Sequence, residues 1–194
     1  LTDAGGERQP CTAVAIEIAA GERTAAAVVG GTRPSGIVVG GDQLVVTGSG
    51  GVLELAKSSG DAIGSGGLSV INNGSVIRLV SGEQVNNSAA VAIDDSGFLE
   101  LADFTETTGP VTFTQTSSSQ CGAIRTGSTG TLVLNGNLTF NNNTDNNSTT
   151  DARNVLITGT GTKSTPTTTG TLDLGGVTRT ILVNTTTVGA NEPN

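Results

Sequence analysis

The sequence predicts an all-β protein whose chain coils into a parallel β-helix, a form of β-solenoid. The first observation is a recurring signature, Gly-x-Leu-x-Leu, which starts at Gly51, Gly97, Gly130 and Gly170, with a looser relative at Gly74. The second is spacing: the starts at 51, 74 and 97 lie 23 residues apart (74 − 51 and 97 − 74), within the roughly 20–50 residues of solenoid repeats. The third is composition, because 29 glycines, many β-branched residues and no Met, Trp, Tyr or His favour strands and turns.

The signature itself describes a strand with one apolar face. Leu53 and Leu55 are two residues apart and share a face, whereas Glu54 between them points to the other side. We therefore expect leucine and valine rungs to stack into a core, in a coil of three sides. The variable distance between later strands leaves a second fold open, a Gly/Thr-rich antiparallel β-sandwich with Greek-key connections.

Residues 1–50 lack the signature and form a separate amino-terminal segment. They contain short candidate strands punctuated by Gly and Pro: Thr12–Ile18, Ala25–Val29, Ile37–Val39 and Gln43–Thr47. Solenoids need atypical ends to stay soluble, so we interpret this segment as a cap or docking segment for the first coil.

Residues 51–194 form the predicted repeat region. Its polar stretches, 141–151 and 160–169, cannot bury apolar surface and are interpreted as loops that protrude from the coil. Such insertions would explain the longer intervals from Gly97 to Gly130 and from Gly130 to Gly170. The expected strands are Val52–Ala56, Leu68–Ile71, Val76–Val80, Ala90–Ile93, Phe98–Leu101, Val111–Gln115, Thr131–Leu134, Leu138–Phe140, Asn154–Thr158, Thr171–Leu174 and Thr180–Asn184.

Charge and hydropathy narrow the classes of function. The net charge is −8, and the nine basic residues are scattered singly, which argues against nucleic acid as a partner. No stretch approaches the roughly 18 uninterrupted apolar residues of a membrane-spanning helix. The chain starts at Leu1 with neither Met nor a basic-then-apolar signal, so we expect a removed leader or a segment of a larger polypeptide.

Two cysteines, Cys11 and Cys121, leave two possibilities open. They form one disulfide between the amino-terminal segment and the middle of the chain if the compartment is oxidising, or they are two buried thiols. We expect no metal and no cofactor, because the sequence has no His and no CxxC pair.

Carboxylates are the best candidates for chemistry. Asp94, Asp95, Glu100, Asp103 and Glu106 lie within thirteen positions and could bind calcium or flank a sugar. The favoured alternative is structural: Asp94 and Asp95 belong to a turn, and Glu100 is the outward residue of its strand. Since no His, Tyr or Trp supplies a base or a stacking platform, we expect no enzymatic activity.

Two further motifs are candidates for catalysis or for modification. A Ser-Lys nucleophile would have to use Lys57 or Lys163, the only lysines, and both lie in turn or loop sequence. Asn-x-Ser/Thr triplets are potential glycan acceptors, although a chain rich in Asn and Thr produces them by chance. They start at Asn73, Asn86, Asn137, Asn142, Asn146, Asn147 and Asn184.

Four stretches carry a resemblance to a known family: GVLELAKSSGDAIGSGGLSVINNGSVIRL, SGFLELADFTETTGPVTFT, GTLVLNGNLTF and GTLDLGGVTRTILV. They resemble the passenger repeats of bacterial autotransporters and related secreted repeat proteins, above all the large surface proteins of planctomycete-type bacteria. The resemblance covers roughly residues 43 to 185. It implies sections of a parallel β-helix outside the cell, whereas the two cysteines and the first forty residues lie outside the pattern.

The ends of a solenoid expose unpaired backbone groups, which makes them candidate assembly sites. At one end stand Val14, Ile16 and Ile18, and at the other Ile181 and Val183; they could pair between subunits, or the first strand could cap its own chain. The resulting hypothesis is an extracellular or cell-surface scaffold that pairs with itself or with flanking repeats. The alternatives are an adhesin that binds surface glycans through the loops at 141–151 and 160–169, and a polysaccharide-acting enzyme.

Overall fold

The computed structural model describes backbone and side chains for residues 43–47, 52–71, 74–115, 122–141 and 170–184. It describes the backbone alone for 15–17, 26–28, 36–40, 142, 155–157 and 185. Cys11, Cys121, Val14, Ile18 and Lys163, and the loop residues 143–151 and 160–169, lie outside these ranges. Asn141 and Asn142, expected in the first loop, instead end a strand.

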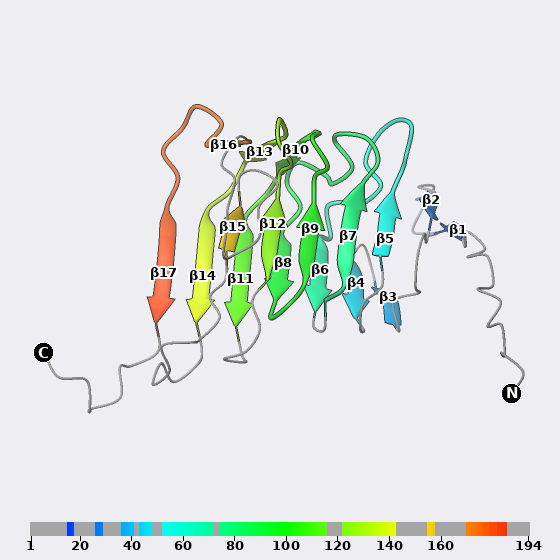
Figure 1. The fold of residues 1–194 in the computed structure, drawn as a ribbon, viewed down its shortest axis with the longest axis horizontal. Coiled ribbons are helices and arrows are strands. Elements are labelled where there is room, and N and C mark those ends of the chain that lie inside the picture. Colours follow the sequence, from blue (N-terminus) through cyan, green and yellow to red (C-terminus); the bar gives the residue numbers. More distant parts are fainter. Residues whose placement is uncertain are drawn as a thin grey trace, which may run out of the picture.

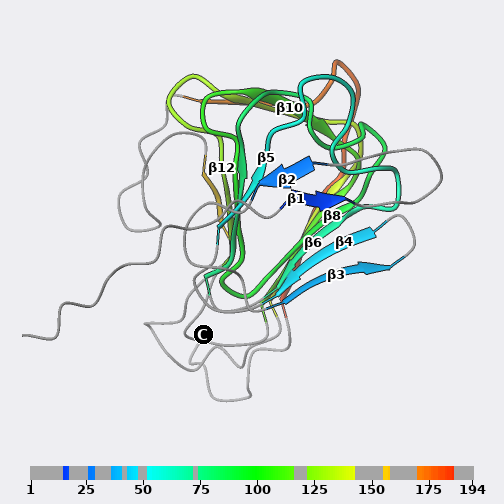
Figure 2. The ribbon, with the colours of Figure 1, turned by 90° about the vertical axis from the view of Figure 1, so that its right-hand side faces the viewer.

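The strands form three sheets that close into the three sides of a coil (Figures 1 and 2). The first sheet has the order β1 (Ala15–Glu17), β2 (Ala26–Val28), β5 (Val52–Leu55), β7 (Val76–Leu79), β9 (Phe98–Glu100), β12 (Ala123–Arg125) and β15 (Val155–Ile157). The second has β3 (Gly36–Gly40), β4 (Gln43–Thr47), β6 (Leu68–Ile71), β8 (Val91–Asp94), β11 (Val111–Gln115), β14 (Leu138–Asn142) and β17 (Ile181–Thr185). The third has β10 (Thr105–Thr108), β13 (Thr131–Leu134) and β16 (Thr171–Asp173).

Parallel pairing joins each coil to the next from β4 onward. Register runs without a slip, for example Leu53 to Ile77 to Leu99 along the first sheet. The predicted parallel β-helix is therefore confirmed, and the antiparallel sandwich is wrong. None of the described residues is helical, so no helix among them could cross a membrane.

Apolar side chains stack in columns inside the coil, as the alternation of the sequence predicted. Phe113 and Phe140 stack in one column with ring centroids 5.1 Å apart and nearly parallel planes. Burial of these rungs is the main source of stability. The two columns of the second sheet are Leu44, Leu68, Val91, Val111, Leu138, Ile181 and Val46, Val70, Ile93, Phe113, Phe140, Val183.

The signature falls on two different sides of the coil, which corrects one interpretation. The long interval from Gly97 to Gly130 does not come from an inserted loop. Phe98 is in register with Ala123, and Thr131 with Thr105, so one coil takes 25 or 26 residues here (123 − 98 and 131 − 105). The signature simply moves from the first sheet to the third. The sequence prediction lacked β10 and β12, and without them this change of side was hidden.

The signature glycine at position 97 serves close packing. Its φ is not positive, and a Cβ there would lie 2.6 Å from the carbonyl oxygen of Val70 in the preceding coil. Gly170 is crowded in the same way, by the side chain of Thr126. Among the signature glycines that the structure describes, Gly74, the looser relative, is the one with a positive φ, of 76°, and it has open space around it. Glycine at position 97 therefore lets adjacent coils approach.

Two strands before β4, namely β2 and β3, run against the direction of the coil. β2 pairs antiparallel with β5, and β3 pairs antiparallel with β4. β4 itself pairs in parallel with β6, so parallel coiling begins at Gln43, within the segment that the sequence analysis separated at residue 50. The parallel ladders thus extend from Gln43 to Thr185.

Candidate functional site

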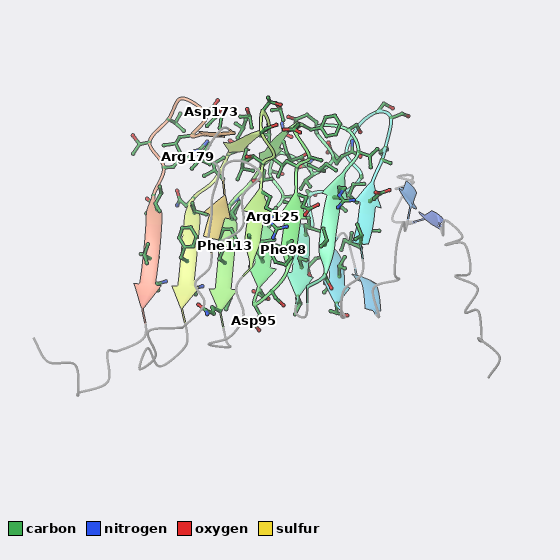
Figure 3. All side chains as sticks on the ribbon, in the orientation of Figure 1. Asp95, Phe98, Phe113, Arg125, Asp173 and Arg179 are labelled. Atoms are coloured by element: carbon green, nitrogen blue, oxygen red, sulfur yellow. The ribbon has the colours of Figure 1, made fainter. Side chains whose placement is uncertain are left out.

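The five clustered carboxylates of the sequence point to different parts of the coil. Asp94 ends β8, and its carbonyl accepts the N–H of Gly97 at 3.0 Å, which closes a turn. Asp95, with φ 48°, occupies the left-handed position of that turn (Figure 3). Partial burial raises the pKa of Asp94. The predicted turn is confirmed for this pair.

Glu100 lies on the outer face of the first sheet, in a ladder of alternating charge. In register across the strands stand Glu54, Arg78, Glu100 and Arg125. Arg78 and Arg125 donate to opposite oxygens of Glu100 at 2.9 and 3.1 Å, and Arg78 lies 3.8 Å from Glu54. Arg125 also sits over the ring of Phe98, 4.3 Å from its centroid (Figure 3). This glutamate therefore joins three coils.

Asp103 ties one corner of the coil to the next. Its carboxylate accepts the backbone N–H of Thr129 at 2.8 Å and the hydroxyl of Ser128 at 3.0 Å. These hydrogen bonds lower the pKa of Asp103. Glu106, in contrast, points into the core and is fully buried. Across the described ranges, no three Asp, Glu or Cys side chains gather in a way that could hold a metal ion.

The other candidate side chains have structural partners. The ammonium of Lys57 donates to the backbone oxygen of Asp61 at 2.8 Å. The amide of Asn86 donates to Asp61 at 2.7 Å, and that of Asn184 donates to Asn141 at 2.7 Å. The amide oxygen of Asn137 accepts the N–H of Thr180. The side chains of Asn73, Asn142, Asn146 and Asn147 are not among those described.

The carboxy-terminal end of the coil is the most unusual surface. β17 is the last strand of the second sheet, and no described strand pairs with its outer edge. Ile181 and Val183 continue the two core columns, yet 52% and 59% of their surface is exposed, because no described rung covers them. Leu174 and Val177, in the turn before β17, are exposed as well. Arg179 holds this turn by donating to the carbonyl of Leu174 at 3.2 Å (Figure 3).

The two proposed assembly strands lie on different sides of the coil. Ile16 belongs to β1, at the edge of the first sheet, where it pairs with β2 of its own chain. Ile181 and Val183 belong to β17 in the second sheet, whose other edge strand is β3. A second copy stacked coaxially would therefore bring β3, rather than β1, next to β17. The sequence carries no local signal for this, because the side on which a strand lies depends on how many strands precede it.

Comparison of the chain with protein-family models, with curated proteins and with solved structures found no match.

Proposed function

We propose that this chain is a structural protein, a section of an extracellular or cell-surface β-solenoid scaffold whose carboxy-terminal end is continued by a further β coil. For the isolated chain, the partner is a second copy. The observation that carries the proposal is the edge of β17, where two core columns stop at exposed Ile181 and Val183.

An uncovered end of a coil exposes backbone hydrogen-bonding groups and apolar side chains of the core. An edge strand presents a row of backbone donors and acceptors, which is a template for another strand. Here the edge also carries large apolar side chains that belong to a core, and burying the exposed half of each contributes about 1 kcal/mol. A further coil would satisfy both requirements at once, because its rungs would continue the registers that already run through β14 and β17.

A scaffold role also agrees with how the polar residues are used. Glu100 and Asp103 join coils, and Asp94 belongs to a turn, so these three carboxylates have structural roles. The outside location is supported by the resemblance of residues 43–185 to secreted surface repeats and by the net charge of −8, which favours solubility of an exposed protein. The adhesin alternative depends on loop residues outside the described ranges.

Sedimentation velocity tests the proposal. The wild-type chain should show an average mass that rises with protein concentration, and Val183→Lys should abolish this rise because it places a charge on the open core column. Thr112→Lys is the matched control, since Thr112 faces outward on β11, away from the end. It should associate like the wild type.

Two results would contradict the proposal. One is a wild-type chain that stays monomeric at every concentration. The other is a Val183→Lys variant that associates as strongly as the wild type and the Thr112→Lys control. The surface location is tested separately, by asking whether protease added to intact source cells removes the protein.

A further inference from the structure

On the third side of the coil, buried side chains join the coils that precede the first regular strand of this side, β10. Among the described residues from Lys57 to Val85, this side contains one isolated parallel bridge, from Ile63 to Val85. In place of a strand pair, the Gln84 side chain binds the backbone of the preceding coil. It accepts the N–H of Lys57 at 2.7 Å and donates to the carbonyl of Lys57 at 3.1 Å. The amide thus acts as an extra peptide group between two coils.

Glu106 repeats this arrangement one coil later. Its two carboxylate oxygens accept the backbone N–H groups of Gln84 and Val85, at 2.8 and 2.7 Å. The exposed fraction of Glu106 is 0%. In the following coils its register position is taken by Leu132 and Leu172. A carboxyl group therefore occupies a position that is apolar in the two coils that follow.

The charges around Glu106 do not compensate an ionised carboxylate. The nearest acidic groups, Asp61 and Glu83, repel it, and the ammonium of Lys57 is directed to the carbonyl of Asp61. The ion pairs among the described residues all lie on the outer face of the first sheet, and none includes Glu106. Burial dominates over the two N–H bonds and raises the pKa of Glu106 to about 7.

We propose that Glu106, at its contact with the backbone of Gln84 and Val85, is a proton-controlled joint between adjacent coils: the packed coils are more stable when this buried carboxyl is protonated than when it is ionised. In the acid form the joint has no buried charge, and one oxygen still accepts an N–H. In the ionised form both N–H bonds remain, but an unpaired charge lies in the core.

The direction of the pH dependence follows from linkage. A glutamate with a folded-state pKa near 7, against 4.5 when exposed, binds a proton about 300-fold more tightly in the folded chain. Between these values the folded state retains a proton that the unfolded chain has lost. The contribution of Glu106 to stability is therefore highest below about pH 4.5, falls as the pH rises from about 4.5 to about 7, and levels off above that.

Thermal unfolding between about pH 5 and about pH 8 tests the joint in three chains. The wild type should lose about 5–10 °C in melting temperature over this range. Glu106→Gln should lose clearly less, because its side chain does not titrate. Glu54→Gln, which removes a glutamate from the outer face, should follow the wild type. Because each variant removes one negative charge, a difference in melting temperature between Glu106→Gln and Glu54→Gln does not come from the overall charge.

A direct titration keeps the proposal testable if Glu106→Gln does not fold. Carbon-13 NMR of the wild-type chain should show the Glu106 carboxyl titrating near pH 7, and the amide signals of Gln84 and Val85 should shift with the same midpoint. A midpoint near 4.5 would overturn the proposal. The proposal would also be overturned if the melting temperatures of the wild type and Glu106→Gln fell by the same amount over this pH range.

Discussion

The two ends of this coil differ in how their ladders stop. At the amino-terminal end, β3 pairs antiparallel with β4, and β2 pairs antiparallel with β5, so the chain reverses against its own first coil. At the carboxy-terminal end, β17 continues the parallel ladder and no described strand follows it. Figures 1 and 2 show the reversed strands at one end only.

Burial within a single column shows what this difference does. Leu44, the rung next to β3, is 2% exposed, whereas Ile181, the last rung of the same column, is 52% exposed. Val46 and Val183 differ in the same way, at 0% and 59%. The end of the coil that has a reversed strand is therefore the end whose first rung is covered. The parallel end has the same kind of side chains, and more than half of the surface of Ile181 and Val183 is exposed there.

The largest expected effect compares the two ends directly. Leu44→Ala should lower the free energy of unfolding by about 2–5 kcal/mol, because it opens a cavity beneath a covered rung. Ile181→Ala removes the same number of carbons from the same column at the open end, and should cost about 1 kcal/mol or less. Urea unfolding at a concentration where the chain is monomeric measures both. Equal losses would mean that the carboxy-terminal rung is covered as well as the first one.

A smaller effect concerns the joins between coils. Gly97→Ala should destabilise the chain by about 1–3 kcal/mol, since its Cβ would press on the backbone of Val70. Gly64→Ala is the matched control, because a Cβ at Gly64 meets nothing within 4 Å and its φ is not positive. It should change stability by less than about 0.5 kcal/mol. If chemical denaturation finds the two variants alike, close approach is not the reason for glycine at position 97.

The smallest effect is expected from the charge ladder on the first sheet. Glu100→Gln removes both ion pairs with Arg78 and Arg125, which are partly exposed, so the loss should be about 1 kcal/mol or less. Added salt should reduce the difference between this variant and the wild type. A loss that is independent of salt would show that packing, rather than charge, gives Glu100 its role.

The sequence predicted the stacked core better than it predicted the sides of the coil. Strands with alternating apolar residues, such as β6, β11 and β13, have the expected boundaries, because their inward residues are visible in the sequence. β10 reads Thr-Glu-Thr-Thr, and its inward Glu106 looks like a solvated or catalytic acid until its backbone partners are known. β12 reads Ala-Ile-Arg, with a single large apolar side chain and no leucine signature, so no alternation marks it as a strand.

The candidate site was predicted only in part, for a related reason. Ile181 and Val183 were identified from their alternation and from their place near the end of the sequence. Their expected partner strand at the other end lies in a different sheet, which local pattern cannot reveal. Gln84 gave no signal either, because a single glutamine in a turn region looks the same whether its amide is buried or exposed.

Hydrogen–deuterium exchange at increasing protein concentration tests the open end most directly. If a further coil adds to β17, amides in the peptide that contains Ile181–Thr185 should become protected as concentration rises, while those of Val111–Gln115 in β11 should be protected throughout. Exchange at Ile181–Thr185 that is fast and identical at every concentration would contradict the account.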